Sequence, residues 1–155
     1  MMQFVIFNIS NEEFAIDIKK VKEIIRVKKS TRIPQAPSFI QGVINLRGDV
    51  IPVVDLRKRF GLDATEITNE TRTVIVEIRD DLLGLIVDAV TEVLRIDEEE
   101  IEPPPNNIAG LKAEYISGVG KVDERLLIIL NIEKLLTSEE RLKLESKALG
   151  KEGSR

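Results

Sequence analysis

Short apolar runs rich in β-branched residues alternate with polar turns along most of the chain. Phe4–Phe7 and Val74–Val76 are two such runs. Branched and aromatic side chains of this kind favour β-strands. The polar groups Asn11–Glu13 and Asp80–Asp81 follow these runs, and residues of these types are typical of turns. Each run is therefore predicted to be the first strand of an antiparallel hairpin.

A further hairpin is predicted around Arg47–Asp49. This tripeptide separates two apolar strands, Val43–Leu46 and Val50–Val54. Gly48 can supply the positive φ angle that a tight hairpin turn needs. Pro52 has no N–H to donate to a ladder, so its strand should lie at a sheet edge or be bulged there.

The chain contains two similar units. Gln3–Val27 aligns without a gap over Arg72–Ile96, and Gly42–Leu56 aligns over Gly118–Ile132. The two blocks occur in the same order in both units. This order favours true repetition over a chance likeness between hairpins.

Small units of several short antiparallel strands avoid exposed edges by curling into barrels. We therefore expect a mainly β protein of two five-stranded barrels packed side by side. The polar connection Asp63–Glu70 ends the first unit, so the subdomains are expected over about 3–70 and 71–136. Each barrel alone is near the lower size limit of a stable domain, so apolar burial between them should stabilise both.

Helical spacing occurs first near the end of the first aligned block. Val21, Ile24 and Ile25 are spaced for one helical face, so Lys19–Ile25 is predicted to be a short helical turn. Such a face is more often core than interface. The groove expected between two barrels, however, could accept a partner helix through the same side chains, and both interpretations stay open.

A C-terminal helix is expected over about 133–148, because apolar side chains share one helical face there. Thr137 and Glu140 have the spacing of a capping box that could restart the helix there. The apolar side chains are those of Ile132, Leu135, Leu136 and Leu142.

Composition excludes several kinds of chemistry. Cysteine and histidine are absent from the 155 residues, so no disulfide, thiol nucleophile, imidazole base or Cys/His zinc site can form. The acidic run Asp97–Glu100 lacks the spaced ligands and central glycine of an EF-hand loop. No phosphate-binding glycine motif occurs, and no two carboxylates stand out as a catalytic pair. We expect no metal, no cofactor and no enzymatic activity.

The charge balance argues against nucleic acid as a partner. The net charge is -4 and the sequence pI is about 5.1, whereas nucleic-acid binding needs a surface that neutralises phosphates. The basic tripeptide Arg57–Arg59 is predicted to be a solvated helix face. No apolar run approaches the roughly 18 residues of a membrane span, and the N-terminus lacks signal-peptide features, so a cytoplasmic location is expected.

Arg47 is a candidate contact residue on local grounds. A long cation at a hairpin tip beside Leu46 is a plausible anchor, because arginine is favoured at protein interfaces. The local sequence fits an ordinary exposed turn residue equally well.

Four segments together resemble the CheW family of chemotaxis coupling proteins. They are FAIDIKKVKEI, TRIPQAPSFIQGVINLRGDVIPVVDLRKRFG, GLIVDAVTEVL and ISGVGKVDERLLIILNIEKLL. The resemblance extends over about 3–147, and the part around Gly42–Leu56 is the most specific. It implies a single domain over residues 1–150, with two SH3-like barrels, short helices and a C-terminal helix.

The resemblance also implies partners. It implies a cytoplasmic adaptor that joins the tip of chemoreceptors to the histidine kinase CheA and takes part in receptor arrays. The groove between the barrels would take the receptor's helical hairpin, and barrel surfaces would pair with the regulatory domain of the kinase. The free protein is expected to be monomeric, not inserted in the membrane and without nucleic acid.

The resemblance and the expected groove and hairpin geometry assign site residues. Residues expected to contact the receptor are Val21, Ile24, Val87 and Val90. Residues expected to contact the kinase are Glu23, Gly42, Leu46 and Arg47. The resemblance supplies Val21, Glu23, Gly42 and Arg47. The other four come from the expected geometry, and those placed in the groove could instead belong to the core.

Two other functions stay open. A CheW-like module could couple a different signalling system, and nothing in the sequence separates the two. A small barrel could also bind nucleic acid or sugar, although the acidic pI and the single tyrosine, Tyr115, provide no stacking platform. No receiver domain is expected after the C-terminal helix, which argues against fusion adaptors that carry one.

Overall fold

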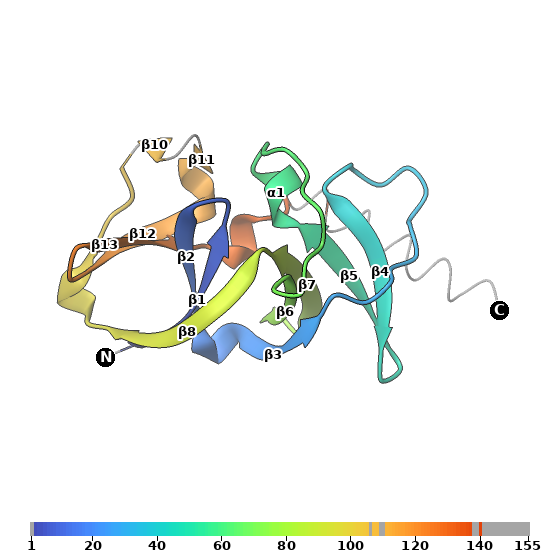
Figure 1. The fold of residues 1–155 in the computed structure, drawn as a ribbon, viewed down its shortest axis with the longest axis horizontal. Helices are drawn as coiled ribbons and strands as arrows, with labels where there is room; N and C mark the ends of the chain where they lie inside the picture. Colours follow the sequence, from blue (N-terminus) through green and yellow to red (C-terminus); the bar gives the residue numbers. More distant parts are fainter. Residues whose placement is uncertain (1, 106, 109–110, 138–139, 141–155) are drawn as a thin grey trace.

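The computed structural model describes residues 2–105, 107–108, 111–137 and 140. Short strands make up most of it (Figure 1). They form two sheets and a small hairpin of β10 (Asn107–Ile108) and β11 (Leu111–Lys112). The mainly β fold predicted from the apolar runs is confirmed.

The first sheet, which we call barrel A, has the strand order β8-β1-β2-β13-β12-β9. Neighbouring strands are antiparallel except β2 and β13, which run parallel. The guanidinium of Arg125 on β13 lies 2.6 Å from a Glu13 oxygen on the neighbouring β2 and 2.8 Å from a Glu92 oxygen on β8. The second contact joins β13 to a strand at the edge of the sheet, as curling of the sheet allows. The strands are β1 (Met2–Ile9), β2 (Glu12–Asp17), β8 (Ala89–Ile96), β9 (Ile101–Glu102), β12 (Ile116–Val122) and β13 (Arg125–Leu130).

The second sheet, which we call barrel B, has the order β3-β6-β7-β5-β4, with β5 and β7 parallel. A backbone bridge between Thr31 and Val43 joins the segment after β3 to β4, so the two edges of the sheet approach each other. The strands are β3 (Val21–Arg26), β4 (Ile40–Leu46), β5 (Asp49–Asp55), β6 (Arg72–Ile78) and β7 (Asp81–Val87).

The strand of Pro52 was predicted to lie at a sheet edge or to be bulged there. It is not an edge strand, because β5 has a neighbour on each side, and the register shift in its pairing with β4 lies beside Pro52, between Ile40 and Gly42 opposite Val53 and Val54. The pairing of β5 with β7 begins only at Val53. At Pro52 the side of β5 that faces β7 is therefore unpaired, so the N–H that proline lacks is not needed there.

The two barrels are built from equivalent strands of the two repeats. Adding 69 to the residue numbers of the β1–β2 hairpin gives the β6–β7 hairpin, and adding 76 to β4–β5 gives β12–β13. Phe4 pairs with Asp17, and their counterparts Thr73 and Ile86 pair in the same way. The predicted repetition is confirmed by this shared register.

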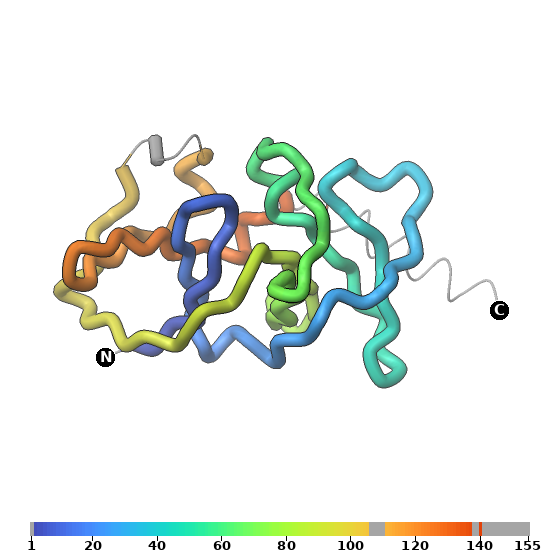
Figure 2. The backbone as a smooth tube through the Cα atoms, in the orientation of Figure 1, coloured from blue at the N-terminus to red at the C-terminus, as the bar shows by residue number. Residues whose placement is uncertain are grey.

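The repeats exchange strands between the barrels. β3 follows β2 in the chain but pairs with β6, and β8 follows β7 but pairs with β1. The exchanged pairings are equivalent, since Phe4 lies opposite Leu94 and Thr73 lies opposite Ile25. Figure 2 shows the chain leaving the barrel of its first hairpin and crossing to the other one.

The expected subdomains 3–70 and 71–136 therefore do not coincide with the barrels, because each barrel takes strands from both halves. The helical turn η1 (Ile18–Lys20) is the physical reason in the first half. It contacts both β1 and β6, and it turns the chain out of one sheet into the other.

One apolar core joins the two barrels. It includes Phe14 of β2, Leu85 of β7 and Leu130 of β13, all buried. The ring of Phe14 stacks on Phe60, which follows the helix of barrel B, with ring centroids 5.6 Å apart. Apolar burial stabilises by about 25 cal/mol per Å², so this shared core holds the barrels together as expected. Smaller apolar clusters fill each barrel separately.

The predicted helical turn over Lys19–Ile25 is wrong for most of its length. Of this segment only Lys19 and Lys20 are helical, as the end of η1, and β3 begins at Val21. Pairing with β6 supplies backbone hydrogen bonds that the local spacing does not reveal. The other single turns are α1 (Leu56–Arg59), η2 (Glu98–Glu100), η3 (Ala113–Tyr115) and η4 (Ile132–Lys134).

The predicted C-terminal helix over 133–148 lies mostly outside the described residues. Within them, Leu135 and Leu136 follow η4 and are buried in the shared core. The reciprocal bonds of the predicted capping box are present: Thr137 N–H donates to Glu140 Oε1 at 2.8 Å, and Glu140 N–H donates to Thr137 Oγ1 at 3.0 Å.

Candidate functional site

β3 carries three of the predicted contact residues. Val21 and Glu23 are half-buried, whereas the side chain of Ile24 is 39% exposed. The strand has a β-bulge between Val21 and Glu23, an irregularity that often re-aims side chains near functional surfaces. Ile24 thus offers apolar surface to a partner, and Val21 packs against the shared core from the edge.

β8 repeats this arrangement on barrel A. Val90 and Val93 are the counterparts of Val21 and Ile24, because their numbers differ by 69. Val90 packs against the shared core, and Val93 is 49% exposed. Val93 was missed by sequence reasoning, although the repeat alignment that pairs it with Ile24 could have found it.

β3, η1 and β8 lie along one side of the molecule (Figure 1). The turn η1 contacts β1, the partner of β8, and β6, the partner of β3. The structure therefore places Val21, Ile24 and Val90 on the side where the two barrels meet. We call these three residues with Val93 the apolar strip.

Val87 does not belong to the apolar strip. It ends β7 with 1% of its side chain exposed and lies in the shared core, so it cannot reach a partner. Leu46 is also buried, at 9% exposure, against Ile51 and its neighbours inside barrel B. Val87 was predicted to contact the receptor and Leu46 to contact the kinase. Both are buried by sheet packing, which depends on pairing between strands far apart in the sequence.

Gly42 has a structural role beneath the predicted kinase surface. Its φ angle is +148°, and a Cβ atom there would lie 2.3 Å from the carbonyl oxygen of Thr31. Two hydrogen bonds, of 2.9 and 2.8 Å, join the backbone of Thr31 to that of Val43 beside it. Gly42 is buried and lets these backbones approach, so it supports the hairpin from within.

The structure brings Arg47 and Glu23 together. Arg47 and Gly48 both have positive φ, as a two-residue hairpin turn requires, and Gly48 N–H donates to the Asn45 side chain at 2.9 Å. The Arg47 guanidinium forms an ion pair with Glu23 of β3. Its side chain is 70% exposed, so the hairpin tip presents a positioned cation to solvent.

The basic turn α1 is not the solvated face that its sequence suggested. Arg57 donates two hydrogen bonds to Asp88, at 2.9 and 2.6 Å, and Asp88 also accepts one from Ser10 N–H at 2.7 Å. Burial opposes the charged form of Asp88, but these donors hold its pKa below the ordinary value. The hydrogen bond to Asp88 in turn raises the pKa of Arg57.

Arg59 is more deeply buried, with 11% of its side chain exposed. Its guanidinium carbon lies 4.1 Å from the ring centroid of Phe39 and 5.2 Å from that of Tyr115. It also binds the Glu140 carboxylate at 3.0 Å. Both cations are paired, as buried charges must be. Because their partners lie on other elements, Arg57 and Arg59 connect barrel B to barrel A and to the start of the C-terminal segment.

The described side chains do not assemble a metal centre. No group of three or more acidic residues in that part of the chain is placed to hold a metal ion. No helix found there has the length and apolar character that crossing a bilayer requires. The arrangement offers exposed apolar and charged contact surfaces, which suit binding to another protein.

Comparisons with known proteins agree with this picture. The model of the CheW-like domain family matches residues 3–140. "Chemotaxis protein CheW" of Klebsiella aerogenes is 42% identical, over 89% of this chain and 83% of that protein. The Bacillus subtilis protein of the same name is 40% identical over 88% of each.

A solved structure is similar along nearly the whole chain. It is the crystal structure of the scaffolding protein TtCheW from Thermoanaerobacter tengcongensis, with a TM-score of 0.84 and 40% identity, covering 90% of this chain and 94% of that one. The family resemblance seen in the sequence is thereby confirmed, and the chain belongs to the family of CheW-like domains.

Proposed function

We propose that this chain is a non-catalytic adaptor of bacterial chemotaxis that links the tip of chemoreceptors to the regulatory domain of the kinase CheA. The observation that carries this proposal is the family match over residues 3–140, with relatives named chemotaxis and scaffolding proteins. The adaptor acts in the cytoplasm, is monomeric when free and meets the membrane only through its receptors.

The apolar strip is the proposed receptor contact. An amphipathic helix binds a groove through apolar anchors spaced along one face. Ile24 and Val93 offer exposed apolar surface on neighbouring barrels, and Val21 and Val90 line the junction beneath them. A helical hairpin laid between the barrels would cover all four side chains.

The β4–β5 hairpin tip with β3 is the proposed kinase contact. Arg47 is the exposed cation there, and Glu23 orients it. Gly42 and Leu46 act indirectly, because both are buried and fix the position of the hairpin. A charged group at a rim steers association and register more than it adds raw affinity.

No chemical step is required of this adaptor. It raises the local concentration of the kinase at the receptor and transmits changes in their relative position. A coupling free energy of about 1–3 kcal/mol between the two contacts is enough for such control.

Calorimetric titration of the chain against a receptor tip fragment and against the kinase regulatory domain tests the proposal. We expect binding to each alone and to both together. Arg47→Glu should weaken kinase binding about tenfold or more by reversing the exposed charge, without lowering the melting temperature. Arg79→Glu is the matched control, since Arg79 is also an exposed arginine with positive φ at a hairpin turn.

Two outcomes would contradict the assignment. Binding to neither partner by a folded sample would move the function to another signalling system. Early melting of the Arg47→Glu variant would make Arg47 a structural residue and remove it from the kinase contact.

A further inference from the structure

The two barrels have equivalent open ends, and each end holds a pocket. The pocket of barrel B has a volume of about 500 Å³ and that of barrel A about 460 Å³. Asp55 and Ile86 line the first, and their repeat counterparts Asn131 and Asp17 line the second. The pockets are therefore the same feature of the fold in two copies, and differences between them reflect their side chains.

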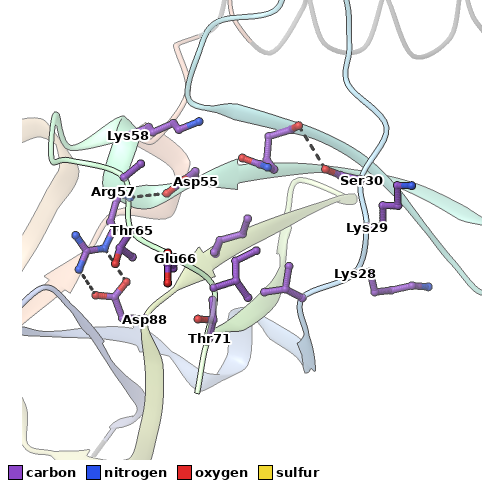
Figure 3. A pocket seen from close by; sticks show the side chains of 15 residues that line it. Lys28, Lys29, Ser30, Asp55, Arg57, Lys58, Thr65, Glu66, Thr71 and Asp88 are labelled. Atoms are coloured by element: carbon purple, nitrogen blue, oxygen red, sulfur yellow. Dashed lines mark hydrogen bonds and ion pairs between the residues drawn. The ribbon is translucent and has the colours of Figure 1, made fainter. Parts of the chain in front are cut away.

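The pocket of barrel B combines an apolar floor with a cationic rim. Val27, Ile67 and Ile86 supply apolar surface, and Ile67 is 63% exposed. Figure 3 shows lysines along one wall and above the opening, with the pair of Arg57 and Asp88 on the opposite wall. The rim lysines are Lys28, Lys29 and Lys58.

Most of the acidic groups in this pocket are already occupied. Asp55 accepts a hydrogen bond from Arg57 N–H at 3.0 Å at the start of α1, and Asp88 is held by the Arg57 guanidinium. Glu66 is the one lining carboxylate without a partner among the described residues.

The rim ammonium groups are available by contrast. Lys29 and Lys58 have no hydrogen-bond or ion-pair partner in the described structure, and Lys28 Nζ donates to the carbonyl oxygen of Asn45 at 2.6 Å. Four cations, which are the three rim lysines and Arg57, against three lining carboxylates leave a net positive charge at this pocket, on a chain whose net charge is -4.

Most of this positive charge is specific to barrel B, since Lys58 is the one rim lysine with a cationic counterpart, Lys134. The repeat alignment that matches Val27 with Ile96 places Asp97 and Glu98 at the counterparts of Lys28 and Lys29. The counterpart of Arg57 in the pocket of barrel A is Glu133. The fold therefore does not demand cations at this position, and the charge reversal distinguishes one pocket chemically from the other.

We propose that the open end of barrel B is a docking site for an acidic peptide segment, in which an aliphatic residue is flanked by carboxylates. The aliphatic side chain covers Ile67 and Ile86, and the carboxylates pair with Lys29 and Lys58. Gln41 and Asp55 of the β4–β5 hairpin line the pocket, but it contains no residue of the apolar strip and none of the predicted kinase contacts, which are Glu23, Gly42, Leu46 and Arg47. This third surface goes beyond the proposed function, so its failure in a test leaves the receptor and kinase contacts untouched.

Fluorescence anisotropy of the full chain with a fluorescein-labelled peptide tests this site. The probe has one isoleucine between two pairs of glutamates, and a second probe has serine in place of isoleucine. We expect saturable binding of the first probe that weakens as salt is added, because exposed ion pairs are screened. The serine probe should bind at least about fivefold more weakly, as expected for loss of a buried aliphatic side chain.

Charge reversal locates the site. The double variant Lys29→Glu with Lys58→Glu should bind the isoleucine probe about tenfold more weakly, through the loss of two exposed ion pairs. Lys20→Glu with Lys134→Glu is the charge-matched control, because Lys134 is the barrel A counterpart of Lys58 and Lys20 lines the pocket of barrel A, and it should bind as the wild type does. Circular dichroism of each variant verifies the fold.

Three results would overturn the proposal. They are no saturable binding by the wild-type chain, equal binding of the serine and isoleucine probes, and equal losses in the double variant and its charge-matched control. The last would show that only overall charge matters. Ile67→Ser gives a second check that introduces no charge, and it should reduce binding of the isoleucine probe alone.

Discussion

Gly42 shows at the residue scale how one missing side chain holds a surface in place. In Gly42→Ala the new Cβ would meet the Thr31 carbonyl oxygen at 2.3 Å, in a backbone conformation with φ of +148°. We expect a loss of about 2–4 kcal/mol in the free energy of unfolding, measured by urea denaturation. The variant should also weaken kinase binding, because the hairpin above it would shift.

Gly48→Ala is the control for Gly42→Ala. Its φ is also positive, at +91°, but no atom lies within 4 Å of the new Cβ. Gly48→Ala should lower the free energy of unfolding only by the cost of placing alanine at positive φ, about 1 kcal/mol. Equal losses in the two variants would contradict the close approach at Thr31 as the cause.

Asp88 predicts a pH dependence. Its folded-state pKa is lowered, so the stability it contributes is present above the unfolded value of 3.8 and is lost as the pH falls through the lower folded value. Asp88→Asn should lower the free energy of unfolding by about 1–2 kcal/mol at pH 7, since the pair with Arg57 is only partly exposed.

The test of the Asp88 prediction is urea unfolding of both proteins at pH 7 and at steps down to about pH 3. The difference between wild type and Asp88→Asn should shrink over the acidic steps. A difference that stays constant would mean that Asp88 acts through packing and not through its charge.

Single residues divide into those that local sequence reveals and those that it does not. The turn at Gly48 was predictable, because hairpin turns require positive φ and glycine provides it. The burial of Val87 and Arg59 was not, because each depends on partners far away in the sequence. The basic tripeptide Arg57–Arg59 suits a solvated helix face equally well.

At the scale of the element, β3 explains why the site was only partly predictable. Val21, Ile24 and Ile25 fit a helical face, yet the segment is a strand with a bulge. Three apolar positions over five residues do not separate the two periods. Pairing with β6, some fifty residues later in the sequence, decides between them.

The exposed position of Ile24 on this strand gives a clean test of the receptor contact. Ile24→Ser should lower the free energy of unfolding by only about 1 kcal/mol, because the residue is 39% exposed and loses only part of a full apolar burial. Receptor binding should weaken about tenfold through loss of an apolar anchor. Calorimetric titration with the receptor tip fragment measures this affinity.

Leu126→Ser is the control for Ile24→Ser, since Leu126 on β13 is 61% exposed and lies outside the apolar strip. It should leave receptor binding unchanged. Equal weakening in both variants would assign the effect to general surface hydrophobicity and remove Ile24 from the contact.

For the whole molecule, the repeat was visible in the sequence but the exchange of strands was not. The third strand of a repeat could pair with the first strand of its own repeat or with the equivalent first strand of the other repeat. Both arrangements satisfy the same pattern of apolar residues, so side-chain periodicity cannot choose between them. The short turn η1, which contacts strands of both sheets, directs β3 across.

The exchange predicts that neither half of this chain folds alone, although each contains a complete repeat. Residues 1–70 retain the β1–β2 hairpin but lose its partners β8 and β13, and residues 71–155 lose β3 and β5. Isolated hairpins are marginal in water, so each fragment should lack the circular dichroism of folded sheet. An equimolar mixture should regain it, because every missing pairing is then restored. A fragment that folds by itself would show that each repeat can close its own barrel, and that the exchange does not determine stability.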